Sequence, residues 1–312
     1  MTQPRIVFLG TPEFAVPSLE ILVRNRYPVV GVVTQPDRPR GRGKQTAPPP
    51  VKAFAEAQGL ALLQPERVKD PAFLEAFRNL APDLVAVAAF GQLLPKEMLG
   101  LPPLGCINVH PSLLPKYRGA APLNWTIIQG ETRTGVTIMR MDEGMDSGDI
   151  LLQEETPVGP GETFGELHDR LARMGAELLL KTVRMIEEGT VRRTPQDHGA
   201  ATFAPRLKKE DGRIDWSRGA AEIVRRVRGL SPSPCAYTLL QGKTLRIFSA
   251  AGRAVPSDRV PGTVGAATAE GLPVAAGDGV VLLREVQMEG RKRMPVGDFL
   301  RGCRLQPGDR LG

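Results

Sequence analysis

Asn108 and His110 are the two side chains whose types and spacing best suit shared chemistry. They flank Val109 at the end of an apolar run that is typical of a strand. Because side chains alternate along a strand, both would project from one face while Val109 points into the opposite layer. An imidazole can take a proton from an attacking amine, and a carboxamide NH₂ can stabilise an oxyanion, so the pair suits acyl transfer. A satisfied polar pair at a strand end is the alternative for this short motif.

An acidic stretch at 142–149, DEGMDSGD, is the second candidate for chemistry. It places four acidic residues and two glycines in a turn between two β-rich runs, 135–141 and 150–153. A carboxylate beside an imidazole would orient the ring and stabilise its charged form. A solvated hairpin turn is the alternative, whereas the spacing lacks the EF-hand pattern of a calcium loop.

A basic stretch at 35–50, QPDRPRGRGKQTAPPP, follows a strand-like run. Arg38, Arg40, Arg42 and Lys44 alternate there with Pro and Gly. The stretch is too long and too rich in Pro and Gly for a tight turn, which favours a mobile loop able to contact phosphates. It is not a phosphate-binding Walker A loop, because the glycine spacing is wrong and Gln45 replaces the Ser or Thr. An exposed flexible connection is the alternative.

Cysteine and histidine usage argues against a metal site and a disulfide framework. The three cysteines stand far apart at 106, 235 and 303, and the three histidines, at 110, 168 and 198, have no metal-ligand spacing. His168 lies in an amphipathic helical pattern and His198 in a Pro- and Gly-containing segment. His110 is therefore the best candidate for a catalytic imidazole, and we predict no metal.

The elements that must position these residues alternate between strand and helix. Strand-like runs occur at 5–9, 29–34, 61–63, 84–88 and 106–109, and helical patterns at 16–23, 51–58 and 71–79. This order predicts an α/β domain with a doubly wound, mostly parallel sheet. Ligands bind at the carboxyl ends of the strands in such a sheet, which is where Asn108 and His110 would lie. A capping box of Thr163 and Glu166 opens a predicted helix over 163–188.

The C-terminal third has a different character. Residues 190–207 lack periodicity and contain Pro195, Gly199 and Pro205, which predicts a linker. Short β-rich runs follow at 244–248, 262–264 and 280–283, typical of a small OB-like β-barrel or sandwich. We therefore expect a catalytic domain over 1–189, a linker over 190–207 and a β-domain over 208–312.

Charge is distributed unevenly along the 312 residues. The net charge is +7, yet residues 191–312 contain 21 Lys and Arg against 12 Asp and Glu, an excess of nine positive charges. Such an asymmetry predicts a polyanionic partner for this part, nucleic acid being the commonest. Arg-rich solvated faces are the alternative. No apolar run approaches the length of a membrane span and the N-terminus lacks a signal-peptide pattern, so we expect a cytoplasmic protein without a membrane partner.

Several of these stretches together resemble a known family. They are GTPEFAVPSL at 10–19, QPDRPRGRGK at 35–44, INVHPSLLPKYRGAAP at 107–122, GVTIMRMDEGMDSGDIL at 135–151 and APRLKKEDGRIDW at 204–216. Stretch 110–122 is similar to the 10-formyltetrahydrofolate-dependent formyltransferases in general. The basic loop and the C-terminal region narrow the resemblance to methionyl-tRNA formyltransferases.

The resemblance implies roles for individual residues. The catalytic Asn, His and Asp of the group map to Asn108, His110 and Asp146. The segment Ser112, Leu113, Leu114 and Pro115 matches a folate-contacting segment, and the turn 90–94 would line the pterin pocket. Contacts to tRNA are expected from the basic residues Arg38, Arg42, Lys44, Arg206, Lys208 and Lys209. The functional arginine of the family's basic loop maps to Arg42.

The implied activity is transfer of a formyl group from 10-formyltetrahydrofolate to the α-amino group of methionyl initiator tRNA, with no obligate protein partner. A formyltransferase acting on a small amine, such as a nucleotide-linked amino sugar or glycinamide ribonucleotide, is one alternative. It would share the catalytic motif but need neither the basic loop nor the basic second domain. A non-catalytic RNA-binding protein with the same fold is a second alternative, which the intact Asn, His and Asp set disfavours.

Overall fold

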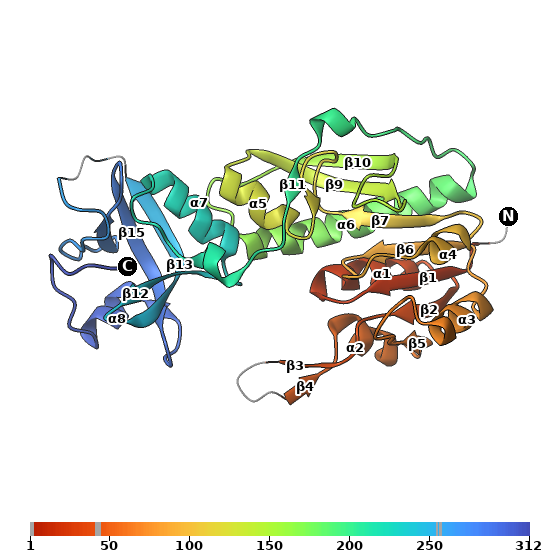
Figure 1. Ribbon diagram of the computed structural model, residues 1–312, viewed down its shortest axis with the longest axis horizontal. Coiled ribbons are helices and arrows are strands. Elements are labelled where there is room, and N and C mark those ends of the chain that lie inside the picture. The colour runs from red at the N-terminus through yellow and green to blue at the C-terminus, as the bar shows by residue number, and fades with distance from the viewer. Residues whose placement is uncertain (1–2, 41–44, 254, 256–257) are drawn as a thin grey trace. The chain divides into compact units, whose positions relative to one another are not determined.

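The computed structural model describes residues 3–40, 45–253, 255 and 258–312 (Figure 1). The chain divides into two compact units, each considered by itself below. The first unit comprises Met1–Pro122, Arg133–Pro157 and His168–Pro205, and the second comprises Leu123–Thr132, Val158–Leu167 and Arg206–Gly312. The predicted boundaries at 189 and 208 stay a prediction.

A seven-stranded sheet forms the centre of the first unit, in the order β10-β9-β7-β6-β1-β2-β5. The strands from β7 to β5 in this order are parallel, whereas β9 and β10 are antiparallel to their neighbours. The strands are β1 Ile6–Gly10, β2 Val29–Val33, β5 Leu62–Leu63, β6 Leu84–Ala88, β7 Cys106–His110, β9 Arg133–Arg140 and β10 Ile150–Pro157. The predicted α/β fold with a mostly parallel sheet is confirmed.

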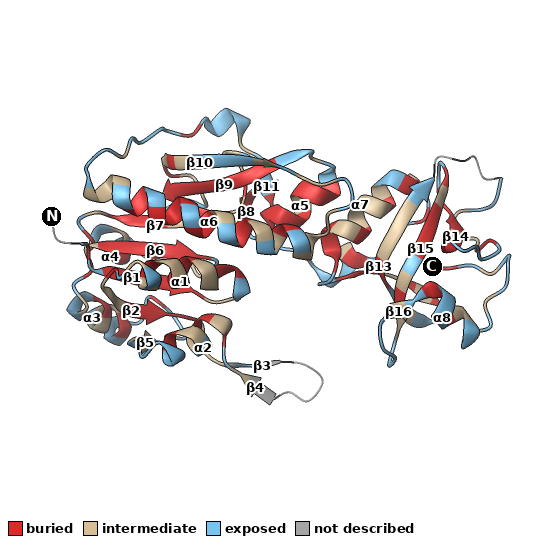
Figure 2. Ribbon diagram, turned by 180° about the vertical axis from the view of Figure 1, so that it is seen from behind, coloured by how far each residue is buried: buried red, intermediate tan, exposed pale blue. Residues whose placement is uncertain are grey.

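Helices cover this sheet, and Figure 2 shows the central strands as buried bands. Every residue of β1 and of β6 is buried, as expected for strands between two helical layers. The helices are η1 Glu13–Ala15, α1 Val16–Arg24, α2 Pro50–Ala57, α3 Pro71–Asn79, α4 Lys96–Gly100 and α6 Phe164–Glu187. The predicted capping box is present at the start of α6, where Thr163 N donates to Glu166 Oε2 at 2.8 Å.

The close approach of α6 to β7 depends on Gly175. A Cβ atom at this position would lie 2.7 Å from Val109 Cγ1. Val109 therefore points into the helical layer, as strand alternation predicted, and Asn108 and His110 belong to the opposite face of β7.

The direction of winding reverses beside β1. From β1 the chain adds β2 and β5 on one side, and β6 and β7 on the other. Hydrogen bonds connect the loops that follow β1, β2 and β6. Thr11, after β1, donates through Oγ1 to the carbonyl of Phe90, after β6, at 3.2 Å, and Gln35, after β2, donates through Nε2 to the same oxygen at 3.3 Å. This edge of the sheet is where doubly wound folds bind their ligands.

The predicted basic loop contains short strands. β3 (Arg38–Arg40) pairs antiparallel with β4 (Gln45–Ala47). Asp37, before β3, accepts hydrogen bonds from Gln64 Nε2 at 2.8 Å and from Lys52 Nζ at 2.7 Å, and both bonds hold the pKa of its carboxyl below the usual value. The base of the hairpin is thereby attached to the α/β core.

Most of the segment predicted as a linker, 190–207, belongs to the first unit. β11 (Phe203–Ala204) pairs in parallel with β8 (Arg118–Gly119). Earlier in the segment, Thr194 and Ile150 form an antiparallel bridge. Residues 194–204 therefore lie between the acidic loop, 142–149, and the loop after β7.

The second unit contains an antiparallel sheet in the order β12-β13-β15-β14, with β16 also paired to β15. Its strands are β12 Ala236–Leu240, β13 Lys243–Arg253, β14 Leu272–Ala275, β15 Val280–Met288 and β16 Met294–Pro295. The predicted β-runs at 244–248 and 280–283 lie in β13 and β15. The third, at 262–264, forms only isolated bridges, from Thr263 to Arg310 and from Val264 to Val274.

Helix α7 (Ala220–Leu230) was not predicted, and it completes the core of this unit. It buries Ile223, Val227 and Leu230, which recur at helical spacing, in one cluster with residues of the sheet. The remaining helical elements of this part are α5 Pro122–Gln129, η3 Lys209–Gly212 and α8 Val296–Arg301. Within the described residues, none of the helices has the length and apolar character needed to cross a bilayer.

Candidate active site

His110 ends β7 and is nearly inaccessible, with 3% of its surface exposed. Its Nε2 lies 3.0 Å from the main-chain carbonyl oxygen of Tyr117. Because a carbonyl can only accept, Nε2 carries a hydrogen and donates it. The other ring nitrogen, Nδ1, is therefore the one that can take up a proton.

Asp146 faces that second nitrogen. Its Oδ2 lies 3.6 Å from His110 Nδ1. The same oxygen accepts a hydrogen bond of 2.8 Å from the main-chain N–H of Gly119. Asp146 adopts a left-handed backbone conformation with φ of 51°, which a non-glycine residue rarely adopts without support from its surroundings. A carboxylate so placed can stabilise a protonated imidazole.

The acidic loop is an ordered turn. Asp142 accepts from the Ser147 hydroxyl at 2.8 Å and from the Gly144 N–H at 3.0 Å. Gly148 is required where the loop returns, because a Cβ atom there would lie 1.9 Å from the Arg140 carbonyl oxygen. The loop is therefore held by internal hydrogen bonds and is not a plain solvated hairpin, and one of its four acidic residues, Asp146, faces His110.

Asn108 lies two residues before His110 on β7 and is half-buried. It pairs with Val87 of β6 on one side and with Met139 of β9 on the other. Strand alternation therefore places its carboxamide on the same face as the His110 imidazole. The structure brings His110 and Asp146 into direct proximity, and Asn108 shares their side of the sheet.

The predicted folate segment, 112–115, is held by Thr137 of β9. Thr137 Oγ1 donates to the Ser112 carbonyl at 2.7 Å and accepts from Leu114 N at 3.2 Å. The Ser112 hydroxyl donates to the Lys116 carbonyl at 2.7 Å, so it closes the loop internally. The half-buried Leu113 and Pro115 are the members of this segment that retain partly exposed surface.

The predicted tRNA contacts fall into two groups. In the basic hairpin, Arg38 is exposed, while Arg42 and Lys44 lie outside the described residues. At the start of the second unit, Arg206, Lys208 and Lys209 are all exposed. Exposed Lys and Arg side chains are suited to phosphate contacts.

Three polar groups near His110 were not predicted as site residues. They are the Tyr117 carbonyl, the Gly119 N–H and the side chain of Gln196, whose Nε2 donates to the Asp146 carbonyl at 2.9 Å. Main-chain groups leave no residue-type signal in a sequence. Gln196 is a single polar residue in a segment without periodicity, so no pattern singled it out.

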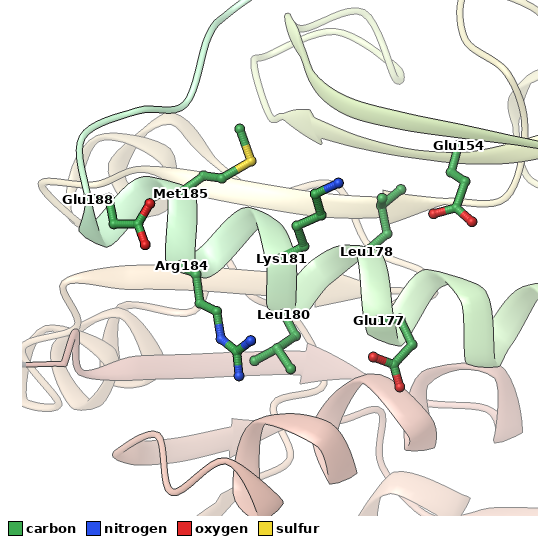
Figure 3. Close-up of a pocket in the computed structure, with 8 residues that line it drawn as sticks. All are labelled: Glu154, Glu177, Leu178, Leu180, Lys181, Arg184, Met185 and Glu188. Carbon is green, nitrogen blue, oxygen red and sulfur yellow. The ribbon is translucent and has the colours of Figure 1, made fainter.

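An open hollow of about 470 Å³ lies elsewhere, along α6, with Glu154 of β10 also among its lining residues (Figure 3). It is lined by Glu154, Glu177, Leu178, Leu180, Lys181, Arg184, Met185 and Glu188. None of these lining residues is a predicted site residue, and their mixed charges favour neither an anion nor a cation. Among the described residues no group of three or more His, Cys, Asp and Glu side chains is placed to hold a metal ion.

Comparison with known sequences identifies the family of this chain. The family described as formyl transferase matches residues 4–183, and the formyl transferase C-terminal domain matches residues 206–304. A methionyl-tRNA formyltransferase from Syntrophus aciditrophicus is 62% identical over 314 aligned residues, covering 100% of both chains. The chain belongs to the methionyl-tRNA formyltransferase family.

Further similarities agree with this membership. The methionyl-tRNA formyltransferase of Citrifermentans bemidjiense is 52% identical and is covered over 98% of its length, with 100% of this chain aligned. The fold is similar to that of HypX from Aquifex aeolicus in complex with tetrahydrofolic acid, with a TM-score of 0.66 and 21% identity. That match covers 100% of this chain and 51% of HypX. This member of the methionyl-tRNA formyltransferase family is thus an enzyme of the transferase class.

Proposed function

We propose that this enzyme transfers a formyl group from 10-formyltetrahydrofolate to the α-amino group of methionyl initiator tRNA, producing N-formylmethionyl-tRNA for translation initiation. The single observation that carries this proposal is full-length identity of 62% to a methionyl-tRNA formyltransferase. The arrangement of His110 and Asp146 supports it, because formyl transfer to an amine requires a group that accepts the proton released by the amine.

In the proposed reaction the amine nitrogen attacks the formyl carbon and a C–N bond forms. The bond between that carbon and the folate nitrogen then breaks, and the folate nitrogen takes a proton. His110 can accept the proton released by the amine and pass it to the folate nitrogen only through Nδ1, because Nε2 donates to the Tyr117 carbonyl. Protonation places a positive charge 3.6 Å from Asp146 Oδ2, where the carboxylate stabilises it.

Asn108 is assigned to the developing oxyanion. Negative charge accumulates on the formyl oxygen during attack, and a carboxamide NH₂ held on a strand can donate to it without reorganisation. The position of Asn108 on the same face of β7 as His110 supports this role.

The donor is assigned to the segment Ser112, Leu113, Leu114 and Pro115. The hydrogen bonds of Thr137 hold the backbone of this segment, and Leu113 and Pro115 offer apolar surface to a planar ring. The tetrahydrofolic acid named for the HypX structure supports folate as the donor class. The turn 90–94 is assigned to the same ligand, with Leu93 64% exposed beside buried Phe90 and Leu94.

The acceptor tRNA is assigned to the basic residues of both groups. Arg38, Arg42 and Lys44 belong to the hairpin, and Arg206, Lys208 and Lys209 begin the C-terminal part, which has an excess of nine positive charges over residues 191–312. We further propose a cytoplasmic location, where translation initiates, and no obligate protein partner.

The decisive experiment offers the protein 10-formyltetrahydrofolate together with one of two acceptors, methionyl initiator tRNA or a nucleotide-linked amino sugar. Formylation of the tRNA acceptor, detected by mass spectrometry of the released amino acid, is the expected result. Formylation of the amino sugar alone would replace the proposal with a small-amine formyltransferase. Binding of tRNA without any product would leave an RNA-binding protein.

A further inference from the structure

Gln196 lies outside the residues to which the proposed chemistry assigns a role, yet it is 6% exposed and contacts the acidic loop. Its Nε2 donates to the Asp146 carbonyl at 2.9 Å and to the Gly148 carbonyl at 2.7 Å. One of these carbonyls belongs to Asp146 itself, which adopts a left-handed conformation, and the other lies two residues further along the loop. The side chain therefore holds the main chain at Asp146 and at Gly148, directly after the residue that presents the carboxylate.

The other end of the Gln196 carboxamide is bound as well. Its Oε1 accepts from Arg118 Nη2 at 2.7 Å and from Arg118 Nε at 3.1 Å. An amide has two N–H donors and two acceptor lone pairs, and all four are used here. The orientation is thereby fixed, because a flipped amide would set its NH₂ against the donors of Arg118 and its oxygen against two carbonyls.

Arg118 connects this network to the other half of the site. It is 5% exposed, and its neighbours Tyr117 and Gly119 contact His110 Nε2 and Asp146 Oδ2 respectively. Arg118 Nη2 also lies 3.2 Å from His198 Nδ1, and since a guanidinium only donates, that nitrogen accepts.

The segment that carries Gln196, residues 194–204, contacts the main chain near both Asp146 and His110. The bridge of Thr194 with Ile150 anchors it beside the acidic loop, and the Thr202 hydroxyl accepts from Tyr117 N at 2.9 Å. Residues 194–204 thus contact the main chain around Asp146 and also the main chain that bonds to His110. A displacement of this segment would change the distance between Asp146 Oδ2 and His110 Nδ1.

We propose that Gln196 is a positioning residue for formyl transfer, which acts through the main chain of the acidic loop to hold Asp146 against His110. This inference rests on the proposed function, because it assigns Gln196 to the same reaction. It also gives residues 194–204, which the sequence predicted as part of a linker, a part in catalysis.

The test compares kcat and KM of the full-length wild type with those of Gln196→Ala, Gln196→Glu and a control, Gln58→Ala. Gln58 is an exposed glutamine at the end of α2, so its loss should leave both constants unchanged. Gln196→Ala should lower kcat about 10- to 100-fold, the size of effect expected for a small misplacement of a catalytic group. KM for tRNA and for the folate should change less than about threefold.

Gln196→Glu separates the two halves of the network. The carboxylate can still accept from Arg118, but it opposes the Asp146 and Gly148 carbonyls with an oxygen instead of a donor. Its kcat should fall at least as far as that of Gln196→Ala. A Glu variant with wild-type kcat would overturn the proposal, and so would loss of the melting transition in both variants, since Gln196 would then serve stability.

A double-mutant cycle with Asp146→Asn gives the sharpest readout. If Gln196 acts through Asp146, then Gln196→Ala should cost less than about threefold once Asp146→Asn is present. If kcat of the double variant instead falls by the product of the two single-variant losses, Gln196 acts independently of Asp146 and the proposal is contradicted. Failure of the wild type to formylate methionyl-tRNA would instead refute the proposed function, so the two failures are distinguishable.

Discussion

Asp146 accepts a hydrogen bond of 2.8 Å from the main-chain N–H of Gly119 through the same oxygen, Oδ2, that lies 3.6 Å from His110 Nδ1. The carboxylate is therefore located by a fixed main-chain group and directed at the imidazole. The Gly119 N–H can bind an uncharged side-chain oxygen at position 146 as well as a carboxylate, so a substitution can remove the charge and keep this hydrogen bond. Function and folding can consequently be separated at this position.

Asp146→Asn should lower kcat by about 10²-fold or more while the protein stays folded. The Asn side-chain oxygen can still accept the Gly119 N–H, but it no longer carries the charge that stabilises a protonated imidazole. Glu143→Gln is the matched control, because Glu143 belongs to the same loop and forms an exposed ion pair with Lys96, at 3.2 Å. Steady-state kinetics and thermal melts of both variants check this, and near-normal turnover of Asp146→Asn would remove Asp146 from the mechanism.

His110→Ala should lower kcat by about 10²- to 10⁴-fold, the range for loss of a general acid or base, with little change in tRNA affinity. His168→Ala is the control: His168 packs edge-to-face on Phe14 with ring centroids 5.4 Å apart, and we assign it no part in proton transfer. The measurement is kcat under saturating substrates together with tRNA binding by fluorescence. Turnover of His110→Ala within about threefold of wild type would contradict the assigned role.

Thiol labelling should distinguish the three cysteines. Burial raises the pKa of Cys106 to about 12 and that of Cys235 to about 11, whereas Cys303 is partly exposed. The thiolate is the reactive form, so at pH 8 the two buried thiols carry little thiolate, and burial also limits their access to the reagent. A thiol reagent should therefore modify Cys303 first, with the other two reacting only upon unfolding. Rapid labelling of either remaining thiol in native Cys303→Ser would refute this order.

The α/β fold and the location of the site could be predicted because their signals are local. Apolar runs such as 84–88 and 106–109 identify parallel strands, and alternation along 106–110 predicted Val109 in the helical layer, where the structure packs it against Gly175. Helix α7 could also have been found from the spacing of Ile223, Val227 and Leu230, but the whole region was assigned as β-rich.

The support of Asp146 could not be predicted from local pattern. Its conformation depends on Gly119, 27 residues away, and on Gln196, 50 residues away, which the fold alone brings together. The acidic loop contains four carboxylates, and composition does not say which of them faces His110. The resemblance selected Asp146, and the distance of 3.6 Å to His110 Nδ1 agrees with that selection.

Neutralising Arg206, Lys208 and Lys209 together should weaken tRNA binding and reduce its dependence on salt. These exposed side chains would contact phosphates. Binding of the variant to tRNA would then release fewer counterions, because fewer phosphates are neutralised. The log–log slope of affinity against salt concentration should therefore become shallower by roughly one unit per lost contact. The triple Gln variant is measured against wild type across a salt series, with Arg24→Gln as the control. Arg24 is an exposed arginine on α1 paired with Glu20 at 2.7 Å, and its loss should leave the slope unchanged. An unaltered slope for the triple variant would exclude these phosphate contacts.

Arg42→Ala should reduce turnover of bound tRNA more than it reduces binding. The hairpin of β3 and β4 follows β2, whose carboxyl end lies at the same edge of the sheet as that of β7, so the hairpin starts from the edge that carries His110. An arginine there would position the acceptor end of the tRNA, and misplacement of a reacting group by about 1 Å can cost about 10²-fold in rate. Single-turnover rates at saturating enzyme separate this effect from affinity, and Arg38→Ala provides the comparison within the same hairpin. A change confined to KM would show that Arg42 anchors the tRNA body, and the division of work between the hairpin and the C-terminal residues would then be wrong.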